Sequence, residues 1–140
     1  MSNDLPLSDD LPESPPDSML RRVLLAIGVT TVVSGATQAV NPGLVLRLLS
    51  AKDDATSRQL FGTVGMFMVV AGGTVVHGLL SPVRQPIVML WCAAQKLGAA
   101  VAVGSGVKRG VFSKLALLVA AFDLLTSALA ALYWSRLRRG

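Results

Sequence analysis

Four long apolar runs limit what this chain can fold into. They cover residues 19–40, 59–80, 87–107 and 111–134, and each has about 21 to 24 residues. A helix needs roughly 20 apolar residues to cross the ~30 Å hydrocarbon layer of a bilayer. We therefore predict an all-α fold, a bundle of four transmembrane helices.

The composition favours the same class. Of the 140 residues, 52% are hydrophobic and 15% are charged, and the mean hydropathy is +0.60. A water-soluble domain of this size could hardly keep so much apolar surface covered. The single cysteine, Cys92, excludes an intramolecular disulfide, and the single histidine, His77, has no second histidine with which to share a metal. We predict neither a metal nor a cofactor.

The first 18 residues differ from the rest. They hold four of the seven prolines and five of the eight acidic residues, with few apolar side chains to bury. We predict a disordered, acidic, proline-rich tail at residues 1–18, followed by a transmembrane domain at residues 19–140. That domain has a net charge of +10, because all 13 Lys and Arg face only three aspartates. The charges form short clusters between apolar runs, which suits anionic lipid headgroups better than nucleic acid.

The segments between the runs contain turn-forming residues. "NPG" at residues 41–43, "SPVRQP" at 81–86 and "GVKRG" at 106–110 end or separate the runs. The stretch "LVLRLLS" at 44–50 fits either a short amphipathic helix at the membrane interface or a plain loop. Arg58, Tyr133 and Trp134 lie near the ends of runs and are predicted interface anchors.

The charges do not decide the orientation in the membrane. With four spans, six Lys or Arg residues fall on each side, so the positive-inside rule gives a tie. We expect both termini to be cytoplasmic, because the acidic tail has no export signal and "SRLRRG" at the C-terminus suits an anionic leaflet.

Small residues recur at the spacing that lets membrane helices pack closely. In the third run Ala94, Gly98, Ala102 and Gly106 lie four residues apart, and we predict that this row packs against another helix. The second run contributes glycines, and the fourth has a stripe of small residues expected to meet the third helix. These residues are Gly62, Gly65, Gly72 and Gly73 in the second run, and Ala116, Ala120, Ser127, Ala130 and Ala131 in the fourth.

Lys96 and Asp123 are the only charged residues deep within a run. Both fall near the middle of their runs, on adjacent helices joined by a tight turn. A charge at that depth costs about 2.5–3.5 kcal/mol on insertion scales, and an opposite charge at the same depth removes much of that cost. We therefore predict an intramembrane ion pair between Lys96 and Asp123.

Polar residues near the predicted pair are candidates for a hydrogen-bonding shell. They are Gln95, Thr126, Thr30 and Thr31. The pair has two readings: it fixes the register of two helices, or it handles a proton or ligand, since ionisable residues inside a bilayer are functional candidates. The sequence leaves both readings open.

A few scattered positions carry a family resemblance. The stretch "RQLFGTVGMFMVVAGG", a proline-bearing loop, the lysine of "WCAAQKLG" and the aspartate of "VAAFDLL" follow one another between residues 58 and 125. This order resembles small uncharacterised four-helix proteins of bacterial membranes and, more distantly, the DoxX-like and DUF4345-like families. In the former group a glycine usually precedes the lysine, whereas Gln95 stands here. The resemblance covers residues 20–134 and implies the fold and a bacterial cytoplasmic membrane, but no activity.

Three classes of function remain open from the sequence. The first is an accessory or structural protein that packs with itself, as a homo-oligomer, or within a larger membrane complex. The second is a small proton-coupled or solute transporter that uses Lys96 and Asp123. The third is a quinone-linked membrane enzyme, which the lack of a nucleophile motif or phosphate loop makes the weakest.

Overall fold

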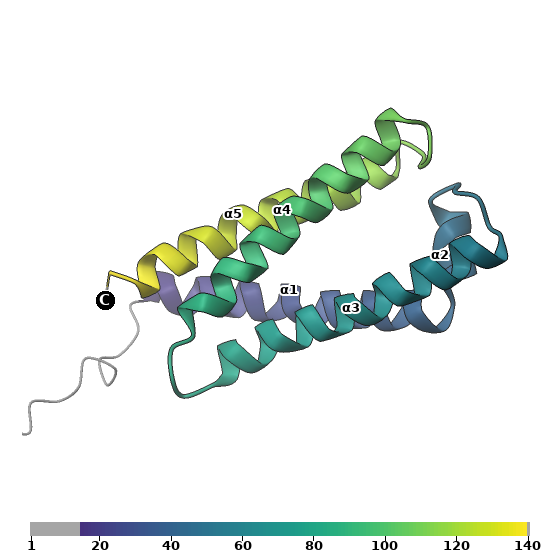
Figure 1. Cartoon of the computed structure of the whole chain (residues 1–140). Coiled ribbons are helices and arrows are strands. Elements are labelled where there is room, and N and C mark those ends of the chain that lie inside the picture. The colour runs from purple at the N-terminus through teal and green to yellow at the C-terminus, as the bar shows by residue number, and fades with distance from the viewer. Residues whose placement is uncertain (1–14, 140) are drawn as a thin grey trace, which may run out of the picture.

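The computed structural model describes residues 15–139, and that part of the chain is all-helical, with no strand. Its helices are α1 (Pro15–Val40), α2 (Pro42–Leu48), α3 (Ala55–Leu80), α4 (Pro86–Lys108) and α5 (Ala116–Leu137) (Figure 1). Four of them, α1, α3, α4 and α5, are long and apolar enough to cross a membrane. The protein is therefore a multi-pass membrane protein, as the four apolar runs predicted.

Most helix ends lie within four residues of the predicted runs: α1 and α3 each begin four residues early, α4 differs by one residue at each end, and α5 ends three residues late. The helices α1 and α3 end at Val40 and Leu80, as predicted, but α5 begins five residues after the expected start at Val111. Gly110 has a φ of +74°, and the backbone N–H of Val111 bonds the carbonyl of Gly106, so the chain turns here instead of starting a helix. The predicted tail lies outside the described residues up to position 14, and residues 15–18 belong to α1.

The segment between the first two long helices contains the short helix α2. The side chain of Asn41 accepts a hydrogen bond from the N–H of Leu44, and Pro42 occupies the first turn, where its missing N–H costs nothing. Asp54 caps α3 in the same way, by accepting from the N–H of Ser57 at 2.8 Å. The stretch that fitted either a helix or a loop is thus largely helical.

The helices α1 and α3 pack as one close pair, and glycines permit the approach. A Cβ placed on Gly35 would lie 2.7 Å from the carbonyl oxygen of Gly65, and one on Gly65 would lie 2.6 Å from that of Gly35. Gly28 and Gly72 make a second crossing contact, because a Cβ on Gly72 would lie 2.9 Å from the oxygen of Gly28. The two backbones therefore touch where no side chain fits between them.

The helices α4 and α5 form the second pair. Ala116 and Ala130 on α5 are fully buried. The hydroxyl of Ser127 on α5 donates to the carbonyl of Ala93 on α4 at 2.7 Å. Ser127 of the predicted stripe thus contacts the third long helix, whereas Ala120 is half-buried and Ala131 is exposed.

The two pairs meet mainly at one end of the molecule. They converge at the end that carries the α3–α4 loop and the end of α5, and they diverge toward the other end (Figure 1). The apolar core lies where they converge and includes Leu24, Leu79, Met89, Ala130 and Tyr133. At the divergent end, the N–H of Ser113 donates to the carbonyl of Leu49 at 2.9 Å, and the rings of Phe61 and Phe112 lie 6.4 Å apart.

The arrangement predicts which loops share a side of the membrane. With Cys92 replaced by alanine, single cysteines at Arg84 and Arg139 should react with an impermeant thiol reagent added to one side of sealed vesicles. Cysteines at Lys52 and Arg109 should react only from the opposite side, because an odd number of spans separates the two sets. Labelling of Arg84 and Lys52 from the same side would show that α3 does not cross.

Candidate functional site

The centre of the α4–α5 pair holds two buried charges. The ammonium of Lys96 donates to the carboxylate of Asp123 at 2.7 Å, and the side chains are only 6% and 9% exposed. Lys96 lies one residue from the middle of α4. The structure therefore brings together a lysine near the middle of α4 and an aspartate in the first half of α5, both on helices long enough to span a membrane.

Helical spacing places both side chains on the inner faces of their helices. On α4, Met89, Ala93, Lys96 and Ala100 are buried at intervals of three or four residues. On α5, Asp123 shares its buried face with Ser127 and Ala130. A single apolar face on each helix thus carries one charge, and the charges meet when the faces pack.

Two further contacts hold the pair in place. The ammonium of Lys96 lies 5.8 Å from the ring centroid of Phe122, within the range of a cation–π interaction. The Ser127–Ala93 hydrogen bond lies one turn away from the pair on both helices and fixes their register. The pair is thus held by groups on the same two helices.

The proposed polar shell does not bond to the pair. The hydroxyls of Thr30, Thr31 and Thr126 donate to the carbonyls of Ala26, Ile27 and Phe122, each one turn earlier in its own helix. Thr30 is exposed, whereas Thr31 and Thr126 are buried. Gln95 is exposed beside Lys96, and no hydrogen bond joins its amide to another described residue. A threonine in a helix often donates its hydroxyl proton to a carbonyl one turn earlier, so that proton is not available to a partner on another helix.

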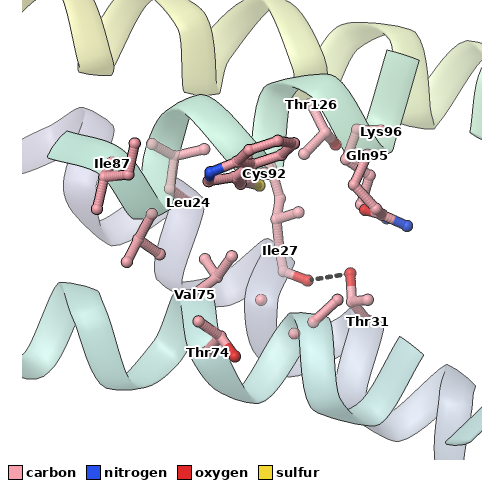
Figure 2. Close-up of a pocket in the computed structure, with 15 residues that line it drawn as sticks. Leu24, Ile27, Thr31, Thr74, Val75, Ile87, Cys92, Gln95, Lys96 and Thr126 are labelled. Carbon is pink, nitrogen blue, oxygen red and sulfur yellow. Dashed lines mark hydrogen bonds between the residues drawn. The ribbon is translucent and has the colours of Figure 1, made fainter. Parts of the chain in front are cut away.

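A cavity of about 390 Å³ lies between the two helix pairs and reaches Lys96. All four long helices contribute to its wall, with Thr126 from α5 (Figure 2). Figure 2 shows Leu24, Val75 and Ile87 toward one end, and Thr31, Gln95 and Lys96 toward the other. The cavity is therefore lined mostly by apolar side chains, with Thr74 beside Val75 and the other polar residues at the end next to the ion pair.

The small-residue row of α4 is placed differently from our expectation. Ala94, Gly98 and Ala102 are exposed, and a Cβ on Gly98 would meet nothing within 4 Å, so the row packs against no other helix in the described chain. Gly98 follows Lys96 by two residues and so points about 200° away from it. Because the ion pair turns Lys96 inward, the row must turn outward. Gly106 does pack, but against the ring of Phe112 in the following loop.

The three predicted interface anchors have different surroundings. Arg58 at the start of α3 and Arg47 of α2 both bond the carboxylate of Asp53. The hydrogen bond from Arg58, followed by that from Arg47, lowers the pKa of the Asp53 carboxyl. Trp134 is half-buried and lies 5.1 Å from the guanidinium of Arg138. Tyr133 is 4% exposed and belongs to the apolar core, so it is not positioned as a surface anchor.

The sequence did not predict several polar contacts, among them two that join α1 to α3. Arg21 of α1 donates through Nε and Nη2 to the carbonyl of Leu79 near the end of α3, at 2.8 and 2.6 Å. Gln38 near the end of α1 donates to the carbonyl of Phe61 at 2.8 Å and is 7% exposed. Both tie α1 to α3. Gln38 was detectable as a polar residue inside an apolar run, but the sequence holds no signal for its carbonyl partner.

No protein-family model, curated protein or solved structure matches this chain. The resemblance to DoxX-like and DUF4345-like proteins therefore remains a prediction from the quoted residues.

Proposed function

We propose that this protein is an accessory component of a membrane, and that it acts by packing α4 against another transmembrane helix. The observation that carries the proposal is the open row of Ala94, Gly98 and Ala102 on the outside of the bundle. Small residues at every fourth position let two helix backbones approach closely in lipid, where apolar side chains alone give no reason to associate.

A second copy of this chain is the first partner to test. Each copy carries the same row, so two copies related by a two-fold axis would present matching surfaces. A larger membrane complex, in which α4 packs against a different protein, is the other form of the same proposal. The two forms differ in whether the purified protein associates alone.

We place the protein in the cytoplasmic membrane of a bacterium with both termini cytoplasmic. The location is supported by the resemblance in residues 20–134, and the basic residues Arg138 and Arg139 after α5 suit an anionic leaflet. The anionic headgroups of that leaflet are the expected lipid partners.

A small proton-coupled or solute carrier is the alternative function. It is favoured by one observation, namely that the cavity between the helix pairs reaches Lys96 of the buried ion pair. Ionisable residues at such depth often lie on ion or substrate pathways. A proton or solute flux into protein-containing vesicles, lost in a Lys96→Met, Asp123→Leu double variant that still folds, would favour the carrier.

The packing proposal predicts the effect of filling the open row. Gly98→Leu should keep the backbones of α4 and its partner apart and weaken association by about tenfold or more, equivalent to about 1.4 kcal/mol. The measurement is the dimer fraction of protein reconstituted in lipid at several protein-to-lipid ratios. If the wild-type protein is monomeric, the readout is instead the amount of another membrane protein that co-purifies with it from cells.

Ala121→Leu is the matched control, because Ala121 is also an exposed small residue but lies on α5 outside the row. It should leave both readouts unchanged. Equal effects of Gly98→Leu and Ala121→Leu, or none from either, would contradict a specific packing face on α4.

A further inference from the structure

The cavity between the helix pairs takes no part in packing α4 against a partner. Its volume of about 390 Å³ lies within the roughly 300–1,000 Å³ typical of small-molecule sites. Ligand sites are mostly apolar with a few polar groups that orient the ligand, and this cavity has that distribution along its length (Figure 2).

The cavity opens sideways, between α3 and α4. Ile87 and Trp91 of α4 line it while remaining 54% and 68% exposed, and Thr74 of α3 is also both lining and exposed. In a multi-pass protein this surface faces lipid tails. A molecule dissolved in the bilayer can therefore enter without crossing water.

The polar end offers one group with no partner in the described chain. The amide of Gln95 makes no hydrogen bond there, although it lies near the middle of α4. A polar group without a partner in hydrocarbon costs several kcal/mol. Thr31 donates its own proton to the carbonyl of Ile27, which leaves its oxygen free to accept.

Charge decides the class of molecule that fits. Lys96 is already neutralised by Asp123, so an anionic headgroup would add an unpaired negative charge beside the pair. A neutral hydroxyl or carbonyl can bond the Gln95 amide without adding charge. We propose that the cavity binds a neutral, single-chain amphiphile, with its chain along Leu24 and Val75 and its hydroxyl or carbonyl head at Gln95.

The test uses full-length protein in phosphatidylcholine nanodiscs and a fatty alcohol that carries a photoreactive diazirine in its chain. The label should appear on cavity-lining residues such as Leu24, Ile27 and Val75. An unlabelled fatty alcohol should displace the probe, while an alkane and an alkyl sulfate of the same length should do so several-fold less well. Label found only on outward-facing residues would overturn the proposal.

The alcohol, the alkane and the alkyl sulfate test separately whether a polar head is recognised and whether it is neutral, and they do so on the wild-type protein. An alkane as effective as the alcohol would mean that the head is not recognised, and a more effective sulfate would mean that the ligand is anionic. Either result overturns the neutral-head assignment. A ketone of equal length should displace the probe as well as the alcohol does. That result would support a neutral head and would mean that a natural ligand can carry either a carbonyl or a hydroxyl group.

Two variants test the location. Ala71→Leu fills the cavity from α3 and should strongly reduce labelling, whereas Ala128→Leu, on the exposed face of α5, should not. Gln95→Leu should weaken displacement by the alcohol about 2- to 10-fold, the worth of one hydrogen bond, and leave displacement by the alkane unchanged. Unchanged labelling in Ala71→Leu would overturn the site. None of these readouts depends on association through α4, so the two proposals fail separately.

Discussion

Lys96→Met is expected to lower the free energy of unfolding by about 3–5 kcal/mol, because it leaves the Asp123 carboxylate buried without its partner. Asp123→Leu should cost a similar amount, since it leaves a buried ammonium. The measurement is the unfolding midpoint in a graded series of denaturing detergent, starting from protein folded in a mild one.

The double variant Lys96→Met, Asp123→Leu should recover most of the loss, because neither charge then has to be kept out of water. Lys108→Met, at the exposed end of the same helix, is the matched control and should change stability by less than about 0.5 kcal/mol. The coupling free energy between Lys96 and Asp123 is the decisive quantity. Strictly additive losses would mean that the two charges do not stabilise one another.

The double variant also separates the two readings of the pair. If it folds and supports the same cellular phenotype as wild type, the pair acts only in holding α4 on α5. If it folds but behaves as a gene deletion does, the charges themselves have a role, and the carrier becomes the better explanation. Stability and phenotype must therefore be measured on the same variants.

Depth was the feature of the site that the sequence could predict. Lys96 and Asp123 stand out because each lies far from the ends of an apolar run, and the two runs are neighbours along the chain. The four long helices were predictable for a similar reason, since only their length and composition matter. Neither prediction depends on which face of a helix points toward the other helices.

The direction in which each helix faces was much harder to predict. On α4, Lys96 and Gly98 cannot both point inward, and the sequence offers a packing argument for each. Burying the ion pair outweighs packing of the small row, because a charge exposed to lipid costs more than a few lost van der Waals contacts. With Lys96 turned inward, Gln95 lies at the edge of the cavity instead of beside Asp123.

The pairing of α1 with α3 was also only partly predictable. The glycines of the second run were visible as a packing surface, but their partners Gly28 and Gly35 were not singled out. Both helices space their paired glycines seven residues apart, at positions 28 and 35 and at 65 and 72. Seven residues are close to two helical turns, so each pair lies on one face. Matching intervals in two runs are the signal that would have identified the contact.

Gly65→Ala is the second change with a large expected effect. The added methyl carbon would lie 2.6 Å from the carbonyl oxygen of Gly35 and 2.6 Å from the backbone nitrogen of Ala39. Both obstacles are backbone atoms of α1, which cannot move aside as a flexible side chain can. We expect α1 and α3 to separate locally and the free energy of unfolding to fall by about 3 kcal/mol, the upper part of the usual cost of overpacking.

Gly73→Ala is the matched control on the same helix, because a Cβ on Gly73 would meet nothing within 4 Å. It should leave stability unchanged or raise it by up to about 1 kcal/mol, since alanine loses less backbone freedom in a helix than glycine does. The same detergent unfolding series measures both variants. Equal losses would mean that the helix is sensitive to any added side chain, and no loss in Gly65→Ala would mean that α1 and α3 do not meet at their glycines. A loss confined to Gly65→Ala would establish that backbone contact between α1 and α3, in addition to the ion pair of α4 and α5, holds the bundle together.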